Sequence, residues 1–93
     1  MATEEQFRAI ALSLPEVIEE LYYGSPAFKV GKTFLTRLRE DGENVVVPMP
    51  RDEREFWMDQ EPRIFHVTKH YENSDAVLVR LAEVDVERLE ELL

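Results

Sequence analysis

The stretch AFKVGKTFLTRLREDGENVVV, residues 27–47, contains three short apolar runs that two glycine-containing turns separate. Apolar and polar side chains alternate along the first two runs, and this period of two indicates strands with one buried face. Gly31 and Gly42 fit tight hairpin turns, because glycine accepts the positive φ that such turns require. The stretch therefore predicts three antiparallel strands joined by hairpins. These strands are placed at residues 28–30, 34–39 and 45–47.

A helix is predicted before this stretch. Thr3 and Gln6 have the spacing of a capping box, in which each side chain binds the backbone N–H of the other residue. An apolar stripe with helical spacing follows at Phe7, Ile10, Ala11 and Leu14. Pro15 ends this helix, since proline lacks a backbone N–H and crowds the preceding turn. We expect residues 16–22 to add a short helical turn with Val17, Ile18 and Leu21 pointing inward.

The second half of the chain alternates helix and strand. Residues 52–60 predict a short helix, which Pro62 ends. The side chains of residues 63–69 and of residues 77–81 alternate as in strands, and a polar loop at 71–75 joins them. Asp85 fits the N-cap of a final helix that continues to the last residue.

The predicted order of elements is α-β-β-β-α-β-β-α. This order indicates an α+β fold, in which an antiparallel sheet of about five strands is flanked by N- and C-terminal helices. A chain of 93 residues has room for one core, so we expect residues 1–93 to form a single domain. The helical pattern is still running at Leu93, which leaves open whether the last helix is cut short there.

The composition narrows the classes of function. The chain has no cysteine, which excludes disulfides, thiolate metal sites and a cysteine nucleophile. It has no apolar run of about 20 residues, and its first residues are acidic, unlike a signal peptide. We therefore expect a cytoplasmic protein with no membrane association.

The net charge of −9 is distributed unevenly along the chain. Residues 1–28 and residues 81–93 each carry five acidic residues against one arginine, whereas residues 29–80 are nearly neutral. A strongly acidic protein stays soluble and repels polyanions at long range. Any anion-binding surface is therefore expected in the middle of the chain.

Four segments together resemble the MmcQ/YjbR family. They are LPEV at 14–17, GSPAFKVGK at 24–32, FHVTKHY at 65–71 and VLVRL at 77–81. The resemblance implies an antiparallel sheet flanked by helices, similar to the CyaY (frataxin-like) arrangement. It also implies DNA binding of a "double wing" type, and it implies no enzyme reaction. This chain is more acidic than a DNA-binding protein usually is, and it lacks the longer, often basic C-terminal helix of other members.

Four cations lie on or beside the first predicted hairpin: Lys29, Lys32, Arg37 and Arg39. Arg37 and Arg39 share one face of their strand, because they are two residues apart. If the strands pair, these side chains gather into a patch that suits phosphates or carboxylates. The alternative is a solvated sheet face whose cations protect an edge from aggregation.

A second candidate group consists of His66, Lys69, His70 and Tyr71. The two histidines are four residues apart, which in a strand separates them by about 13 Å and makes a zinc site improbable. His66 is expected to border a groove, and His70 with Tyr71 to line a ligand surface. The alternative is a loop whose aromatic ring packs on the domain. We expect no metal and no cofactor.

Other groups suggest no chemistry. The serines at 13, 25 and 74 lie in no nucleophile motif, and the acidic run at 52–61 suits the first turns of a helix. We therefore expect no enzyme. Four aromatic residues either stack on bases or complete the core, and the core is the favoured interpretation: Tyr22, Tyr23, Trp57 and Tyr71.

The sequence thus supports a binding module, with two candidate functions. The first is nucleic-acid binding through the sheet and hairpin cations, which the family resemblance favours. The second is a protein-interaction or small-anion-binding domain with no nucleic-acid role, which the net charge favours. The arrangement of the cations distinguishes them, since a continuous positive face suits nucleic acid and scattered cations do not.

Overall fold

The computed structural model describes residues 2–22, 24–39 and 41–93, without the side chain of Tyr22. The described helices are α1 (Glu4–Ser13), α2 (Arg51–Gln60) and α3 (Val86–Leu92), with a 3-10 turn η1 (Lys69–Tyr71). The described strands are β1 (Val17–Tyr22), β2 (Ser25–Val30), β3 (Thr33–Leu38), β4 (Asn44–Pro48), β5 (Phe65–His66) and β6 (Ala76–Arg80). None of the helices in these ranges is long and apolar enough to cross a membrane.

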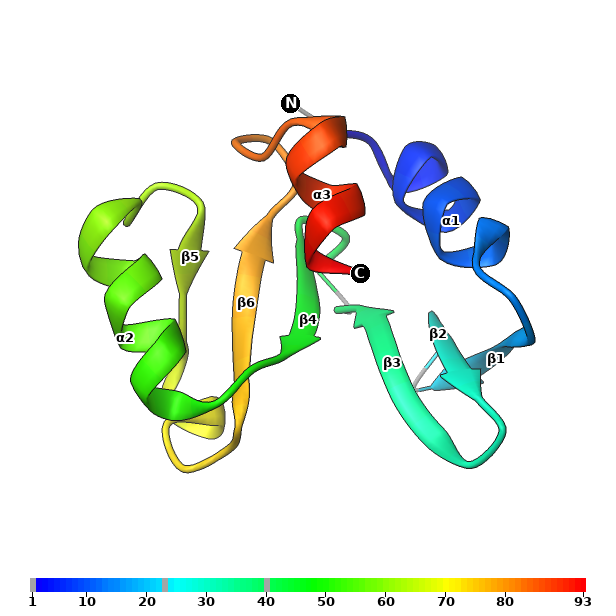
Figure 1. The fold of residues 1–93 in the computed structure, drawn as a ribbon, viewed down its shortest axis with the longest axis horizontal. Coiled ribbons are helices and arrows are strands. Elements are labelled where there is room, and N and C mark those ends of the chain that lie inside the picture. Colours follow the sequence, from blue (N-terminus) through cyan, green and yellow to red (C-terminus); the bar gives the residue numbers. More distant parts are fainter. Residues whose placement is uncertain (1, 23, 40) are drawn as a thin grey trace.

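The strands form one antiparallel sheet in the order β1-β2-β3-β4-β6-β5 (Figure 1). The α+β class and the terminal helices are confirmed, and the described part of the sheet has six strands instead of about five. Both expected hairpin glycines have positive φ, 62° at Gly31 and 71° at Gly42. The helix caps are also as expected, with a capping box at Thr3 and an N-cap at Asp85.

The additional strand is β1, where we expected a helical turn; that expectation is wrong. All six residues of β1 pair with β2, from Val17 opposite Val30 to Tyr22 opposite Ser25. The inward orientation is wrong for two residues, because Ile18 is 54% exposed and Leu21 77% exposed. The long ladder with β2 outweighs a local apolar spacing that also fits a helix.

The strand predicted at residues 63–69 is much shorter than expected, since only Phe65 and His66 are in β5. The backbone N–H of Tyr71 donates to the carbonyl of Thr68, which closes the first turn of η1. The chain therefore leaves the sheet edge early and turns towards one face of the sheet.

One face of the sheet carries the main core, to which all three helices contribute. Phe7 of α1 meets Phe28 of β2 edge to face, with ring centroids 5.5 Å apart. Leu89 of α3 is fully buried in the same cluster, and Trp57 of α2 packs against it with its ring 5.9 Å from that of Phe65. Trp57 is thus a core residue, as the favoured interpretation held, whereas Tyr23 and the side chain of Tyr22 lie outside the described residues.

The opposite face, called the open face below, is defined by a row of paired residues that crosses every described strand. From β1 to β5 the row consists of Glu20, Ala27, Arg37, Val46, Leu78 and His66. Tyr71 of η1 packs on its small apolar cluster, which Val46, Ala76 and Leu78 form. The helices thus occupy one face, and a short loop covers part of the other.

Candidate functional site

A hollow of about 940 Å³ lies in the open face, between the β1–β2–β3 end of the sheet and the loop that carries η1. Five of the eight residues predicted from the sequence line it: Lys29, Arg37, Arg39, His70 and Tyr71. They come from segments more than 30 residues apart in the sequence. The sheet pairing and the fold of the η1 loop bring them together.

Pairing across the strands explains why the cations meet. Arg37 lies opposite Ala27 on one side and Val46 on the other. The ladder between β2 and β3 shifts after Phe28, so that Lys29 faces Phe34. Phe34 therefore comes to the open face beside Lys29 and joins the lining of the hollow.

The two arginines both contact Tyr71. An Nη of Arg37 donates a hydrogen bond of 3.3 Å to the hydroxyl of Tyr71. The guanidinium of Arg39 lies 5.6 Å from the centre of the Tyr71 ring, within the range of a cation–π contact. The His70 ring is nearly perpendicular to that of Tyr71, with the ring centroids 5.0 Å apart. Tyr71 thus connects the two candidate groups, since it contacts Arg37 and Arg39 of the first and His70 of the second.

One nitrogen atom of Arg39 has no hydrogen-bond acceptor among the described residues. This atom, Nε, is buried. A buried donor without an acceptor costs about 1–3 kcal/mol, more when the group is charged. Such groups are rare in native proteins, and a bound water or ion is one of their explanations.

At the other end of the hollow, the charge of Lys29 is already matched. Its Nζ lies 3.0 Å from a carboxylate oxygen of Glu20, and both side chains are partly exposed. The floor of the hollow is apolar and consists of the small side chains of Ala27, Val46 and Ala76. One end is therefore cationic, with an Arg39 Nε that has no acceptor among the residues the structure describes, and the other is apolar with its charge balanced.

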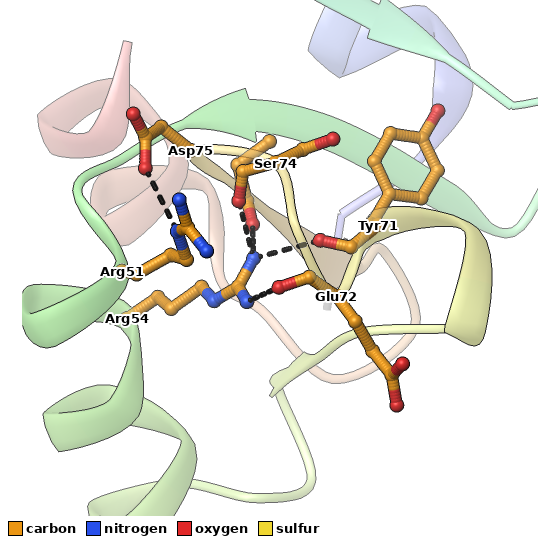
Figure 2. A network of polar contacts seen from close by, with 7 residues as sticks. Arg51, Arg54, Tyr71, Glu72, Ser74 and Asp75 are labelled. Atoms are coloured by element: carbon orange, nitrogen blue, oxygen red, sulfur yellow. Dashed lines mark hydrogen bonds and ion pairs between the residues drawn. The ribbon is translucent and has the colours of Figure 1, made fainter.

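The η1 loop is fixed by Arg54 of α2, a residue that sequence reasoning missed (Figure 2). One terminal nitrogen of Arg54 donates to the carbonyls of Tyr71, Ser74 and Ala76 at 2.7–2.9 Å, and the other donates to that of Glu72 at 2.5 Å. Its side chain points from the helix into the loop, and the residue is 5% exposed.

The sequence did contain one indication that Arg54 is buried, namely its position in the helix. Arg54 lies three and four residues before Trp57 and Met58, both of which pack against the core. Residues with that spacing share one helix face, so Arg54 is a cation on the inward stripe. A buried arginine needs several acceptors, and irregular loop carbonyls provide them.

His66 lies on the open face but does not line the hollow. Its Nε2 is 2.7 Å from the side-chain oxygen of Asn44, whose amide nitrogen donates to Asp41 at 3.0 Å. Burial, together with the nearby charges of Arg80 and Arg39, lowers the pKa of His66 below its usual value. Burial acts to raise the pKa of Asp41, but hydrogen bonds from Glu43 and Asn44 outweigh it and lower that pKa.

The remaining predicted residues stay at the periphery. Lys32 lies exposed in the β2–β3 turn and Lys69 at the exposed start of η1, and neither lines the hollow. No three His, Cys, Asp or Glu side chains gather as a metal site within residues 2–22, 24–39 and 41–93.

The family model described as YjbR matches residues 12–93, which include every residue that lines the hollow. The chain belongs to the YjbR family. The resemblance seen in its sequence segments is thereby confirmed. Comparison with curated proteins gave no significant match.

A solved YjbR-type structure has the same fold. The crystal structure of Deinococcus radiodurans protein DR2400, with a DUF419 domain, superposes with a TM-score of 0.79. The match covers 99% of this chain and 73% of that one, at 22% sequence identity. At this identity the likeness shows the fold alone. The nucleic-acid role and the CyaY-like arrangement stay predictions.

Proposed function

We propose that this YjbR-family domain is a non-catalytic binding domain whose hollow takes up a small anion. The observation that carries the proposal is Arg39, a cation in the wall of the hollow with a buried Nε and no acceptor among the described residues. The planar guanidinium fork matches a carboxylate or phosphate, which accepts two parallel hydrogen bonds. An anion bound beside Arg39 brings acceptors to its guanidinium group.

The size and charge of the hollow support this proposal. A volume of about 940 Å³ lies within the range of small-molecule sites. Arg37 stands two residues from Arg39 on the same face and adds a second positive charge. The carboxylate that lines the hollow, Glu20, is engaged by Lys29. This set of groups suits holding an anion better than transferring a proton.

The test is a titration with inorganic phosphate and with acetate at low salt, followed by NMR of the backbone amides. We expect saturable shifts centred on residues 37–39 and 70–71. Replacing Arg39 by glutamine should weaken binding about tenfold or more, because it removes a charge-assisted hydrogen bond. Lys32→Gln is the matched control, since Lys32 is on the same hairpin but outside the hollow. Shifts that never saturate, or an equal effect of both variants, contradict the proposal.

Nucleic-acid binding is the second candidate, and one arrangement favours it. Phe34, His70 and Tyr71 line the same hollow as three cations, and rings beside cations on a sheet hold single strands by stacking and charge. Titration with single-stranded and duplex DNA at low salt tests it. This candidate requires binding at tens of micromolar or tighter that weakens as salt rises. Absence of such binding eliminates it.

A further inference from the structure

The two ends of the hollow differ in a way that specifies its ligand. We infer that the anion is an elongated aromatic one, with a flat ring at the Phe34 end and a phosphate or carboxylate at the Arg39 end. This inference rests on the proposed anion-binding function and adds the chemical class of the ligand.

The Phe34 end suits an uncharged ring. The Phe34 side chain is 37% exposed although it is large and apolar, and it faces Lys29, whose charge Glu20 balances. Ile18 of β1 lies opposite Lys29 on its other side and is a second exposed apolar side chain next to this lysine. Flat rings gain by lying against such surfaces, and stacking on an aromatic side chain strengthens binding of a base severalfold or more.

The middle of the hollow has space for that ring. Its floor consists of Ala27, Val46 and Ala76, whose short side chains allow a ligand to approach the sheet closely. A water molecule takes up about 30 Å³, so a bare phosphate fills only a small part of 940 Å³. Larger side chains at these positions would fill the hollow.

The length of the hollow sets the length of the ligand. Phe34 and Arg39 are five residues apart along β3 and the turn after it, which is at most about 16 Å. Their side chains both line the hollow, so the groups that they contact are closer together than that. A ring separated from its acid by a sugar or a short chain fits this span.

The experiment compares four probes on the unaltered protein by isothermal titration calorimetry and amide NMR. AMP carries ring, spacer and phosphate; ribose 5-phosphate lacks the ring; adenosine lacks the phosphate; 4-phenylbutyrate replaces the phosphate by a carboxylate. We expect AMP or 4-phenylbutyrate to bind at least about fivefold tighter than ribose 5-phosphate and than adenosine. The tighter of the two shows which combination of ring, spacer and acid group the hollow accepts better.

A variant locates the ring. Phe34→Ala should remove most of the difference in affinity between AMP and ribose 5-phosphate. The affinity for ribose 5-phosphate itself should be unchanged in the variant. Leu12→Ala is the matched control, because Leu12 is similarly exposed, at 43% against 37% for Phe34, and does not line the hollow. Circular dichroism verifies that both variants fold, and the probe comparison on the unaltered protein stands independently of them.

The outcomes separate the two proposals. If neither AMP nor 4-phenylbutyrate binds tighter than ribose 5-phosphate, the aromatic inference is overturned and the anion site is left in place. Adenosine binding as tightly as AMP overturns it as well, because the acid group then contributes nothing. If inorganic phosphate and all four probes fail to bind, the proposed function is wrong, and this inference with it.

Discussion

At the scale of single residues, Arg54 supports the candidate site without lining it. It is a buried cation whose compensation comes from four backbone carbonyls, not from a carboxylate (Figure 2). Three of those carbonyls belong to the loop that presents Tyr71 to Arg37 and Arg39, and the fourth is that of Ala76, where β6 begins. The stability of this loop and the shape of the hollow therefore depend on one side chain of the opposite layer.

Arg54→Met should destabilise the protein by about 3 kcal/mol, because it leaves several carbonyls without a donor in a buried place. Urea unfolding at neutral pH measures this loss. Arg51→Met is the matched control on the same helix, since Arg51 forms an exposed ion pair of 3.3 Å with Asp75. Exposed pairs of this kind contribute about 0–1 kcal/mol. Similar losses in the two variants would show that Arg54 does not anchor the loop.

His66 gives the protein a specific dependence on pH. Its pKa is below 6.5 in the folded state because of burial and of two nearby arginines, so the unfolded chain binds its proton more readily. As pH falls through about 6.5 and towards the folded pKa, His66 therefore reduces stability.

The difference between wild type and His66→Gln isolates this contribution. Glutamine keeps a hydrogen-bonding side chain opposite Asn44 but carries no titrating group. Between about pH 7.5 and about pH 5.5, wild type should lose more unfolding free energy than the variant. Equal losses would mean that His66 does not titrate differently on folding.

At the scale of elements, local signals predicted the hairpins, the caps and the paired arginines. Gly31 joins two strands that pair directly, and Arg37 and Arg39 share a face because they are two residues apart. The register shift that brings Phe34 to the open face is not visible in the period-two pattern. The secondary structure of residues 17–22 could not be predicted locally, because it depends on their pairing with β2. Tyr71 was predicted as part of a ligand surface, but the residue that holds its loop in place, Arg54, was not, because it lies 17 residues earlier in the chain.

Paired substitutions in β1 test its conformation. In a strand, Val17 packs against the core while its neighbour Ile18 is exposed, whereas the helical turn expected from the sequence buries both. Val17→Thr should cost about 1 kcal/mol, because a hydroxyl replaces a methyl group in the core. Ile18→Thr should change stability by less than about 0.5 kcal/mol, since threonine keeps the β-branched shape at an exposed site. Losses of equal size on urea unfolding contradict a strand.

At the scale of the whole molecule, the acidic residues of α1 and α3 lie on the side of the sheet opposite to the hollow. Helices α1 and α3 pack next to each other on the core side, and both carry exposed acidic residues (Figure 1). The cations of the hollow lie on the open face. The principal extents of the molecule are 32, 26 and 23 Å, so these charges are separated by much of its thickness. A net charge of −9 is thus compatible with a local anion site.

This separation predicts how salt changes the influence of α3. At about 20 Å in water, one charge acts on another with about 0.2 kcal/mol, and a phosphate monoester carries nearly two charges. The variant Glu90→Gln/Glu91→Gln should therefore raise AMP affinity two- to fourfold at about 0.01 M salt, where screening extends over about 30 Å. At about 0.15 M the screening length is about 8 Å, well below the thickness of the molecule, and the gain should disappear.

Glu20→Gln provides the contrast, because Glu20 is in the hollow and contacts Lys29 at 3.0 Å. Its removal frees a cation at short range, so the gain in AMP affinity should persist at the higher salt concentration. Calorimetric titration of both variants at the two salt concentrations measures the difference. If the α3 variant gains equally at both, its acids act on the ligand directly, and the hollow is not where the anion binds.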